Sequence, residues 1–414
     1  MHPVLQNLLF IPILFCLIFT ANAQNSTITD TVFLKKIMKT GSKDLKKILD
    51  NPEKYRVQII YTQINRDKNK NLSLKHFAYR NRPEEYFYPA STVKLAASLH
   101  AIEKINSLSQ NGVFKDTKIG FDGSCKCFSE LKKDSLTSDS IPTIENYILK
   151  ALVLSDNESY NRIYDFIGQR YLNQRLWELG YSNARIVNKF ISCDSLDNSC
   201  TNGFVFFNKD NDTLFSQLPE YNSINFSPPF HDMKIGKQFK QGKTILDEPH
   251  DFSSANSMPL SYTHDMLIRL IYPQLYKQEE QFCIKEKDRE FLKKCLSAKP
   301  SETEIPKFQN KEKYWNTYTN YLYYGWDKKA IINENIKIYN IVGLSYGFSV
   351  DCAYITDTTK GVEFFLSTVI YTNEDEILNN DKYEYKTVAM PFLKNLGRLI
   401  YNYELSRDAW SKEK

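Results

Sequence analysis

The chain contains the stretch Pro89-Ala90-Ser91-Thr92-Val93-Lys94-Leu95-Ala96-Ala97-Ser98-Leu99-His100-Ala101-Ile102. Its alanines and leucines and the spacing of its apolar residues predict a helix that begins near Ser91, two residues after Pro89. Ser91 and Lys94 are three residues apart, so a helix places the hydroxyl and the amine on one face, within reach of each other. A serine hydroxyl becomes nucleophilic when a base takes its proton, and a lysine with a lowered pKa can be that base. Ser91 and Lys94 are therefore the candidate nucleophile and base, and free N–H groups at the helix start could hold an oxyanion.

Other interpretations of the serines have to be weighed. S-x-x-K is a common pattern, and Ser91 would also serve as a helix cap. The same spacing from Ser129 to Lys132 lacks the proline and the Ala/Leu helix, and we interpret it as surface sequence. Gly343-Leu344-Ser345-Tyr346-Gly347 matches the G-x-S-x-G elbow of α/β-hydrolases. That elbow needs a following helix and a later histidine, whereas residues 348–355 resemble a strand and the last histidine is His264, so we disfavour it.

A second polar element follows the apolar helical stretch 148–154, which ends in Ser155-Asp156-Asn157. A polar triplet between two helices would project as a loop. Ser155 could relay a proton to a leaving nitrogen, and Asn157 could hold a substrate amide and the Lys94 side chain. The alternative is a helix N-cap followed by the acidic Glu158.

Residues 86–102 and 152–168, in that order, resemble the S-x-x-K and S-D-N elements of class A β-lactamases and penicillin-binding proteins. The resemblance covers most of residues 30–405, except 187–258. It implies a serine hydrolase that forms an acyl-enzyme at Ser91 and hydrolyses a β-lactam or related amide, with a small-molecule or peptidoglycan-like substrate and no cofactor. It leaves open a cell-wall peptidase or esterase of the penicillin-binding type.

Two departures from the family pattern affect the expected activity. The family's K-T-G element should fall just before Tyr346, where the chain has Ile341-Val342-Gly343 and no lysine. The loop after Gly180, where class A enzymes place a glutamate for deacylation, has no Glu or Asp in residues 185–193. These departures predict a raised pKa for Lys94, weak recognition of a substrate carboxylate and slow deacylation. They also make credible a binding protein that kept the fold and lost turnover.

The residues around the missing K-T-G element still resemble a substrate-binding strand edge. We interpret Gly343 and Gly347 as glycines that let substrate approach the backbone. The amide of Leu344 or Ser345 could be the second oxyanion donor.

The hydrophobic patterns place strands at both ends of the chain and helices between them. We expect strands at 57–64, 72–79, 336–342, 348–355 and 362–371, and helices at 30–49, 144–154, 158–168, 172–179, 262–275 and 385–402. This order predicts an α/β (α+β) fold whose antiparallel sheet is flanked by the terminal helices, with an inserted all-helical lobe and an active-site cleft between the two parts.

We expect residues 24–414 to form one catalytic unit. Residues 24–90 and 330–414 supply the α/β part, and residues 91–329 supply the helical lobe. The aromatic and polar segment 187–258 loses the helical signal and is long enough to be a functional loop or lid.

The N-terminus predicts export. Residues 1–23 hold an apolar run without Lys, Arg, Asp or Glu and end in Ala21-Asn22-Ala23, as in a secretory signal peptide. The run is shorter than a bilayer span requires, and no later segment is apolar enough to be one. We therefore expect a periplasmic or secreted protein with no transmembrane segment after signal removal.

Export permits disulfides, and seven cysteines follow the predicted signal. Cys193 with Cys200 and Cys283 with Cys295 are the plausible local pairs, although free buried cysteines are equally compatible with the spacing. Cys125-Lys126-Cys127 we interpret as structural or incidental. The net charge of +5 is spread thinly, and the six histidines form no HExxH, so neither nucleic-acid binding nor a zinc site is expected.

Overall fold

A five-stranded antiparallel sheet forms the centre of the computed structural model, which describes residues 31–127, 130–131, 133–137, 139–227 and 229–407. The strand order is β12-β13-β14-β1-β2, so β1 from the start of the chain pairs with β14 from its end. The strands are β1 (Gln58–Arg66), β2 (Leu72–Tyr79), β12 (Ile336–Ser345), β13 (Phe348–Asp357) and β14 (Val362–Tyr371). The predicted strands and the antiparallel sheet are confirmed.

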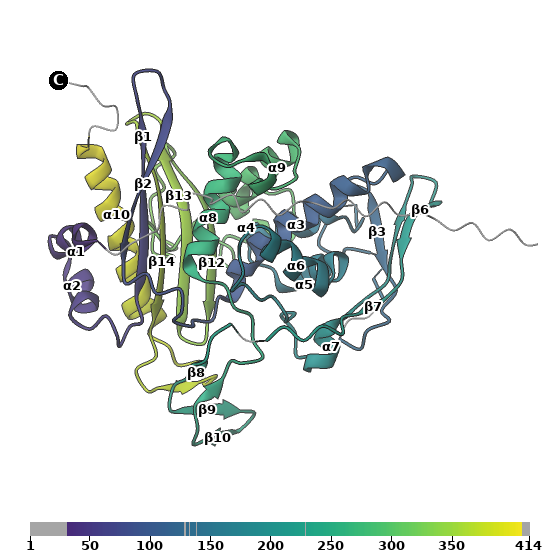
Figure 1. Cartoon of the computed structure of the whole chain (residues 1–414), viewed down its shortest axis with the longest axis horizontal. Coiled ribbons are helices and arrows are strands. Elements are labelled where there is room, and N and C mark those ends of the chain that lie inside the picture. Colours follow the sequence, from purple (N-terminus) through teal and green to yellow (C-terminus); the bar gives the residue numbers. More distant parts are fainter. Residues whose placement is uncertain (1–30, 128–129, 132, 138, 228, 408–414) are drawn as a thin grey trace, which may run out of the picture.

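One face of this sheet is covered by helices from the two ends of the described chain (Figure 1). They are α1 (Val32–Lys39), α2 (Lys43–Asp50) and α10 (Met390–Ser406), the last preceded by the π-helix η7 (Tyr385–Ala389). The single helix predicted at 30–49 is divided in two, because the chain turns at Gly41 and the Leu45 side chain packs against that glycine. The strands between the two layers are buried along most of their length, as expected for a sheet covered on both faces.

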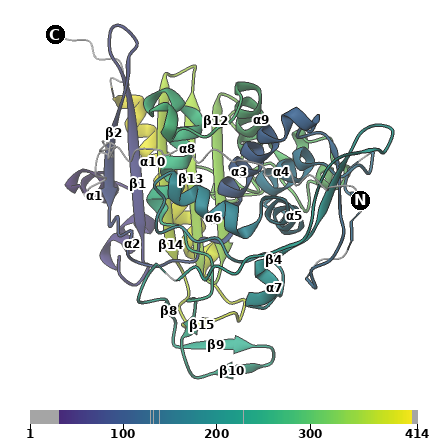
Figure 2. The same cartoon turned by 45° about the vertical axis from the view of Figure 1, so that its right-hand side comes forward.

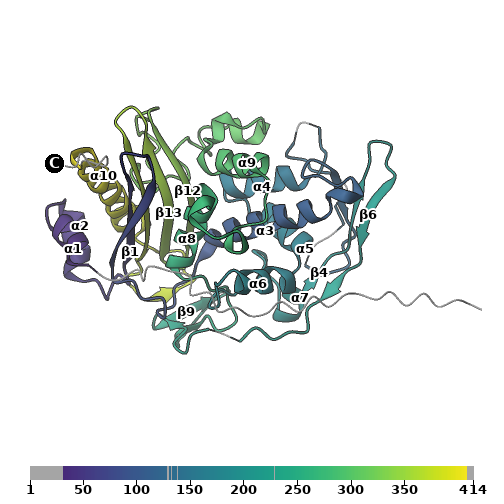
Figure 3. The same cartoon turned by 45° about the horizontal axis from the view of Figure 1, so that its top comes forward.

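The other face packs against α8 (Leu260–Ile271) and a mainly helical lobe (Figures 1 and 3). The main helices of the lobe are α3 (Val93–Ser107), α4 (Ile144–Val153), α5 (Asn157–Ile167), α6 (Gln169–Glu178) and α9 (Glu286–Ser297). The helix α3 is buried on nearly all sides, and it buries the polar side chains of Lys94, Ser98, His100 and Glu103 together with its apolar residues.

The lobe also contains a small antiparallel sheet, so the expectation of an all-helical lobe was too simple. Its strands are β3 (Lys118–Phe121), β5 (Phe204–Phe207) and β6 (Thr213–Gln217). Phe204 and Phe206 point into the core and Val205 and Phe207 are partly exposed, which is the alternation of a strand buried on one face.

Residues 187–258 contain a series of short elements, most of which lie along the lower edge of both parts (Figure 2), whereas β5 and β6 belong to the small sheet of the lobe. They are α7 (Ser195–Ser199), β4 (Cys200–Thr201), β5, β6, β7 (Glu220–Tyr221), β8 (Lys234–Ile235), β9 (Gln238–Gln241), β10 (Thr244–Leu246) and β11 (His250–Asp251). β9 pairs in parallel with β15 (Ile377–Leu378). The buried Arg185 donates to the carbonyls of Phe226 at 3.0 Å and Ala255 at 2.6 Å, so the segment is tied back to the lobe.

The remaining helical segments are single turns. They are η1 (Ala90–Thr92), η2 (Ser109–Asn111), η3 (Pro273–Leu275), η4 (Gln278–Glu280), η5 (Pro300–Glu302) and η6 (Pro306–Gln309). In the part of the chain that the structure describes, no helix is long and apolar enough to cross a bilayer. The predicted signal peptide, residues 1–23, lies outside the described residues.

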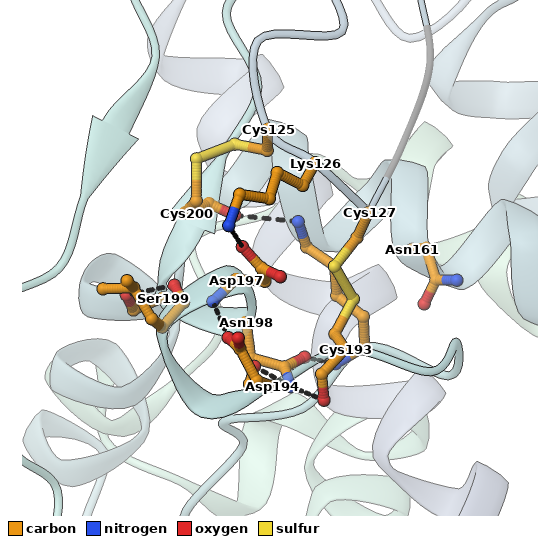
Figure 4. Close-up of a disulfide and its surroundings, with 12 residues drawn as sticks. Cys125, Lys126, Cys127, Asn161, Cys193, Asp194, Asp197, Asn198, Ser199 and Cys200 are labelled. Carbon is orange, nitrogen blue, oxygen red and sulfur yellow. Dashed lines mark hydrogen bonds and ion pairs between the residues drawn. A yellow bond between two sulfur atoms is a disulfide. The ribbon is translucent and has the colours of Figure 1, made fainter.

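Two disulfides join the loop that follows β3 to the segment around α7 (Figure 4). They pair Cys125 with Cys200 and Cys127 with Cys193, so the predicted local pairs were wrong. Cys193 and Cys200 stand on either side of α7, and each faces a cysteine of the Cys125-Lys126-Cys127 turn instead.

The other predicted pair is also absent. Cys283 and Cys295 are free, because Cys283 is exposed ahead of α9 whereas Cys295 lies on the buried face of that helix.

Candidate active site

Ser91 lies where the chain enters α3. The entry is the 3-10 turn η1, in which Ala90 adopts a left-handed backbone with φ of 47° and the Thr92 hydroxyl donates to the Pro89 carbonyl at 2.8 Å. Ser91 is partly buried, whereas the helix that follows is buried. The predicted position of Ser91 at a helix N-terminus is therefore confirmed, with the first turn tighter than an α-helix.

The amine of Lys94 is fully buried and lies beside this hydroxyl. Its Nζ is 3.0 Å from Ser91 Oγ, 3.1 Å from Ser155 Oγ and 2.8 Å from Asn157 Oδ1, and it also donates to the Ser155 backbone carbonyl. The structure thus brings together the four side chains that the two sequence motifs predicted, from α3 and from the α4–α5 junction.

A neutral amine can make these contacts. A neutral amine has two N–H donors and one lone pair, and the Ser155 carbonyl and Asn157 Oδ1 can only accept. If both donors are used there, the lone pair is left for the Ser91 hydroxyl proton. Burial lowers the pKa of Lys94 to about 7, opposed in part by the negative charge of Asp156. The missing K-T-G lysine was expected to leave this pKa high, but burial alone lowers it.

The Ser155-Asp156-Asn157 triplet combines a helix cap with contacts to Lys94, and different residues make the two. Asp156 is the N-cap of α5 and its side chain accepts from the Ser159 backbone N–H at 2.8 Å. Ser155 has a left-handed backbone with φ of 58°, which aims its carbonyl and hydroxyl at Lys94. The cap and the site are thus parts of one turn.

The β12 edge of the sheet runs against the Ser91 turn. A Cβ on Gly343 would stand 2.6 Å from the Pro89 carbonyl oxygen and 3.3 Å from the Ser91 backbone nitrogen. The absent side chain therefore serves the approach of the protein's own backbone, a reason different from the substrate access that we predicted. Leu344 and Ser345 follow on the same edge strand, next to this contact.

The G-x-S-x-G segment is not a nucleophile elbow. Tyr346 and Gly347 form a two-residue hairpin turn with φ of 51° and 84°, typical of a type I′ turn, and the strand β13 follows. Gly347 thus supplies the positive φ that this turn requires.

Phe190 is a site residue that the sequence reasoning missed. Its ring centroid lies 5.2 Å from Lys94 Nζ, and the ring packs on Tyr160 with centroids 4.5 Å apart. Its backbone N–H donates to the buried Asn161 Oδ1 at 2.6 Å. A half-buried aromatic ring therefore covers the amine on one side, where the sequence had shown only the absence of an acidic residue.

One row of side chains on α5 positions this loop. Asn157, Asn161 and Asp165 are four residues apart and share a face of the helix. Asn157 contacts Lys94, Asn161 holds Phe190, and the buried Asp165 pairs with Lys189 at 2.8 Å. This polar row on a largely buried helix is the signal that could have indicated the loop from sequence.

The disulfides brace the same loop from its far end (Figure 4). Lys189 donates to the Cys200 carbonyl at 2.8 Å, and its backbone N–H donates to Asn198 Oδ1 at 2.7 Å. The Cys125–Cys200 and Cys127–Cys193 bonds fix residues 193–200 to the rest of the lobe, and with them the frame on which Phe190 is held. Over the described ranges, no group of three or more His, Cys, Asp and Glu side chains is placed to hold a metal ion.

The fold and these residues together define a serine hydrolase framework of the β-lactamase type. The chain belongs to the β-lactamase enzyme family, whose model matches residues 41–403. No curated protein sequence matches the chain.

Solved structures are similar to this chain at low sequence identity, and the first of them carries the likeness of fold. A mutant of PBP-A, solved as an acyl-enzyme complex with penicillin G, is 11% identical, with 92% of this chain and 99% of that chain covered and a TM-score of 0.51. The β-lactamase from Desulfarculus baarsii is 10% identical, with coverage of 91% and 98% and a TM-score of 0.49. The class A β-lactamase from Clostridium kluyveri is 14% identical, with coverage of 86% and 97% and a TM-score of 0.47.

Proposed function

We propose that this protein forms an acyl-enzyme at Ser91 with a β-lactam or related amide and then hydrolyses it. The observation that carries the proposal is the position of Lys94 Nζ, 3.0 Å from Ser91 Oγ, with its other contacts made to Ser155 and Asn157. This arrangement supports proton transfer from the alcohol to a neutral amine.

In the proposed reaction, Lys94 and Ser155 carry the proton that moves from Ser91 to the leaving nitrogen. Lys94 takes the Ser91 proton as Oγ bonds to the carbonyl carbon, and the proton passes through the Ser155 hydroxyl to the nitrogen as the C–N bond breaks. The Ser91 backbone N–H and that of Leu344 or Ser345 are the proposed oxyanion donors, with Asn157 and Gly343 at the substrate's edge. Water then adds to the ester, releases the acid and restores the hydroxyl.

The proposed substrate class comes from the family. PBP-A, of the same fold, was solved with penicillin G as an acyl-enzyme. We propose a small-molecule β-lactam or a peptidoglycan-like amide for this chain on that basis.

A second candidate, a cell-wall peptidase of the penicillin-binding type, is favoured by Phe190. Its ring covers Lys94 and offers no group that could activate water, so an acyl-enzyme would last longer than in a fast β-lactamase. The two candidates share acylation and differ in the rate of deacylation.

A fluorescent penicillin tests acylation directly. Wild type should become labelled, and Ser91→Ala and Lys94→Ala should not. Ser98→Ala is the matched control, since Ser98 is buried on the same helix and should leave labelling intact. Absence of label from wild type would instead support a binding protein without turnover.

Hydrolysis of a chromogenic cephalosporin then separates the two enzyme candidates. Turnover beyond one equivalent supports a β-lactamase, and a single stoichiometric burst supports the penicillin-binding type.

We also propose export to the periplasm or the medium. The two disulfides and the apolar N-terminal run support this location. Cell fractionation, with mass spectrometry of the N-terminus, tests it: a mature protein beginning at Gln24 is expected, and an uncleaved chain in the cytoplasm would contradict it.

A further inference from the structure

A groove of about 710 Å³ lies at the N-terminal end of α10. The helix α10 covers the face of the sheet opposite to the helical lobe (Figure 1). The lining of the groove includes Trp315, Trp326, Lys386 and Lys394. None of its lining residues belongs to the Ser91 site, so the proposed hydrolase does not account for it.

Two indole rings form the aromatic part of the groove. Trp315 and Trp326 have ring centroids 5.5 Å apart, tilted by 36°, and both are partly exposed. They are two of the four tryptophans of the chain. Two indoles packed against each other offer an apolar surface that tolerates water at its edges.

The backbone is strained to present one of these rings. Trp326 has a left-handed backbone with φ of 57°, which is unusual for a bulky residue. The preceding Gly325 cannot carry a side chain, since its Cβ would stand 2.8 Å from Lys394 Cβ. The fold therefore brings this segment close against α10 while turning Trp326 into the groove.

The charges around the groove leave one cation available. Lys328 pairs with Glu312, and Lys394 with Asp327 at 3.0 Å. The exposed Lys386 instead has its Nζ 6.0 Å from the Trp326 ring centroid. No carboxylate among the described residues lies within ion-pair distance of Lys386.

An aromatic surface, a rim of hydrogen-bonding charged side chains and one unpaired cation together match a sugar that carries a carboxylate. The C–H face of a pyranose packs on an indole, its hydroxyls exchange hydrogen bonds with the rim, and its carboxylate meets the amine. A purely apolar ligand would leave the charged rim unused. We propose that the Trp315–Trp326 groove is a binding site for a carboxylate-bearing pyranose.

The test uses N-acetylmuramic acid and N-acetylglucosamine, amino sugars that differ by a carboxylate-bearing substituent. Each is titrated into the full chain carrying Ser91→Ala, so acylation cannot contribute, and tryptophan fluorescence is followed. We expect saturable binding, tighter for the acid by up to about fivefold, the range of an exposed ion pair. Added salt should reduce this preference.

Two variants locate the site. Trp315→Ala should abolish binding of both sugars, and Lys386→Ala should equalise their affinities. Trp315 is chosen over Trp326 because it is free of the left-handed strain, and an unchanged circular dichroism spectrum checks its folding. Trp177→Phe is the matched control, since Trp177 lies on α6 and should leave the titration unchanged.

Because the titrations use the Ser91→Ala protein, they test the sugar-binding site separately from the proposed hydrolase activity. No saturable change with either sugar, or binding that survives Trp315→Ala, would overturn the site. Equal affinities in the Ser91→Ala protein would overturn the assignment of Lys386 to a carboxylate.

Discussion

The ring of Phe190 lies over the amine of Lys94, with 5.2 Å between the ring centroid and Nζ. The ring is fixed there by Asn161 through the Phe190 backbone and by packing on Tyr160. Because an aromatic ring cannot accept a proton from water, Phe190 provides no base for deacylation on this side of the amine.

Replacing Phe190 by glutamate should shorten the life of the acyl-enzyme. A carboxylate beside Lys94 can take a proton from water, so we expect release of the acyl group to speed up by about tenfold or more. The measurement is the loss of bound fluorescent penicillin with time.

Phe190→Leu is the control for this change, because it keeps an apolar cover over the amine. Its acyl-enzyme should persist about as long as that of wild type. Equal lifetimes for the Glu and Leu variants would contradict the role of the ring.

Acylation should depend on pH through Lys94. Its pKa is lowered to about 7 by burial, and only the neutral amine can accept the Ser91 proton. The acylation rate should therefore rise about tenfold per pH unit below pH 7 and level off above it. Stopped-flow labelling from pH 5 to 9 checks this, and a rate independent of pH would exclude Lys94 as the base.

Lys94→Met should be inactive and more stable. The ordinary lysine pKa of 10.5 applies in the unfolded chain, and burial lowers it to about 7 in the folded protein. The stability cost is thus fully present below pH 7 and disappears as pH rises to about 10.5. We expect a gain of about 1–4 kcal/mol at pH 6, as for other buried charges replaced by apolar residues.

Urea unfolding of wild type and Lys94→Met at pH 6 and pH 10 measures this difference. The gain should shrink at the higher pH. A variant less stable than wild type at pH 6 would show that the hydrogen bonds of the amine outweigh the cost of its burial.

Gly343→Ala should push β12 away from the Ser91 turn. The new Cβ would meet the Pro89 carbonyl oxygen at 2.6 Å, a contact with backbone that cannot be relieved by side-chain rotation. We expect a stability loss of about 1–3 kcal/mol and slower acylation. Gly120→Ala, whose nearest contact is at 3.4 Å, is the control in the same unfolding and labelling assays. Normal acylation by Gly343→Ala would show that the strand edge does not shape the site.

Removing the Cys127–Cys193 bond should destabilise the lobe while leaving acylation intact. The bond closes a loop of 66 residues, and its loss by double serine substitution should cost about 2–5 kcal/mol. Ser91, Lys94 and Ser155 are held by helices that the bond does not join, so labelling should proceed at the wild-type rate. Cys283→Ser, which changes an exposed free thiol, is the control. Loss of labelling in the double variant but not in this control would show that acylation depends on the disulfide.

Elements with local signals could be predicted from the amino-acid sequence. The apolar runs and the alternation of apolar residues predicted the terminal strands, and the Ala/Leu composition predicted α3. The three-residue spacing of Ser91 and Lys94 placed both on one turn of that helix. Helical geometry fixes the distance between residues three apart, so the Ser91–Lys94 contact was predictable.

Contacts between distant segments of the chain could not be predicted from the sequence, because they depend on how the elements pack. The two nested disulfides, the ring of Phe190 over Lys94 and the fit of Gly343 against Pro89 each join residues far apart in the chain. The lowered pKa of Lys94 has the same origin, because burial is a property of the packed lobe. Spacing along the chain fixes which groups can meet within one element, whereas packing between elements determines their partners and their charge.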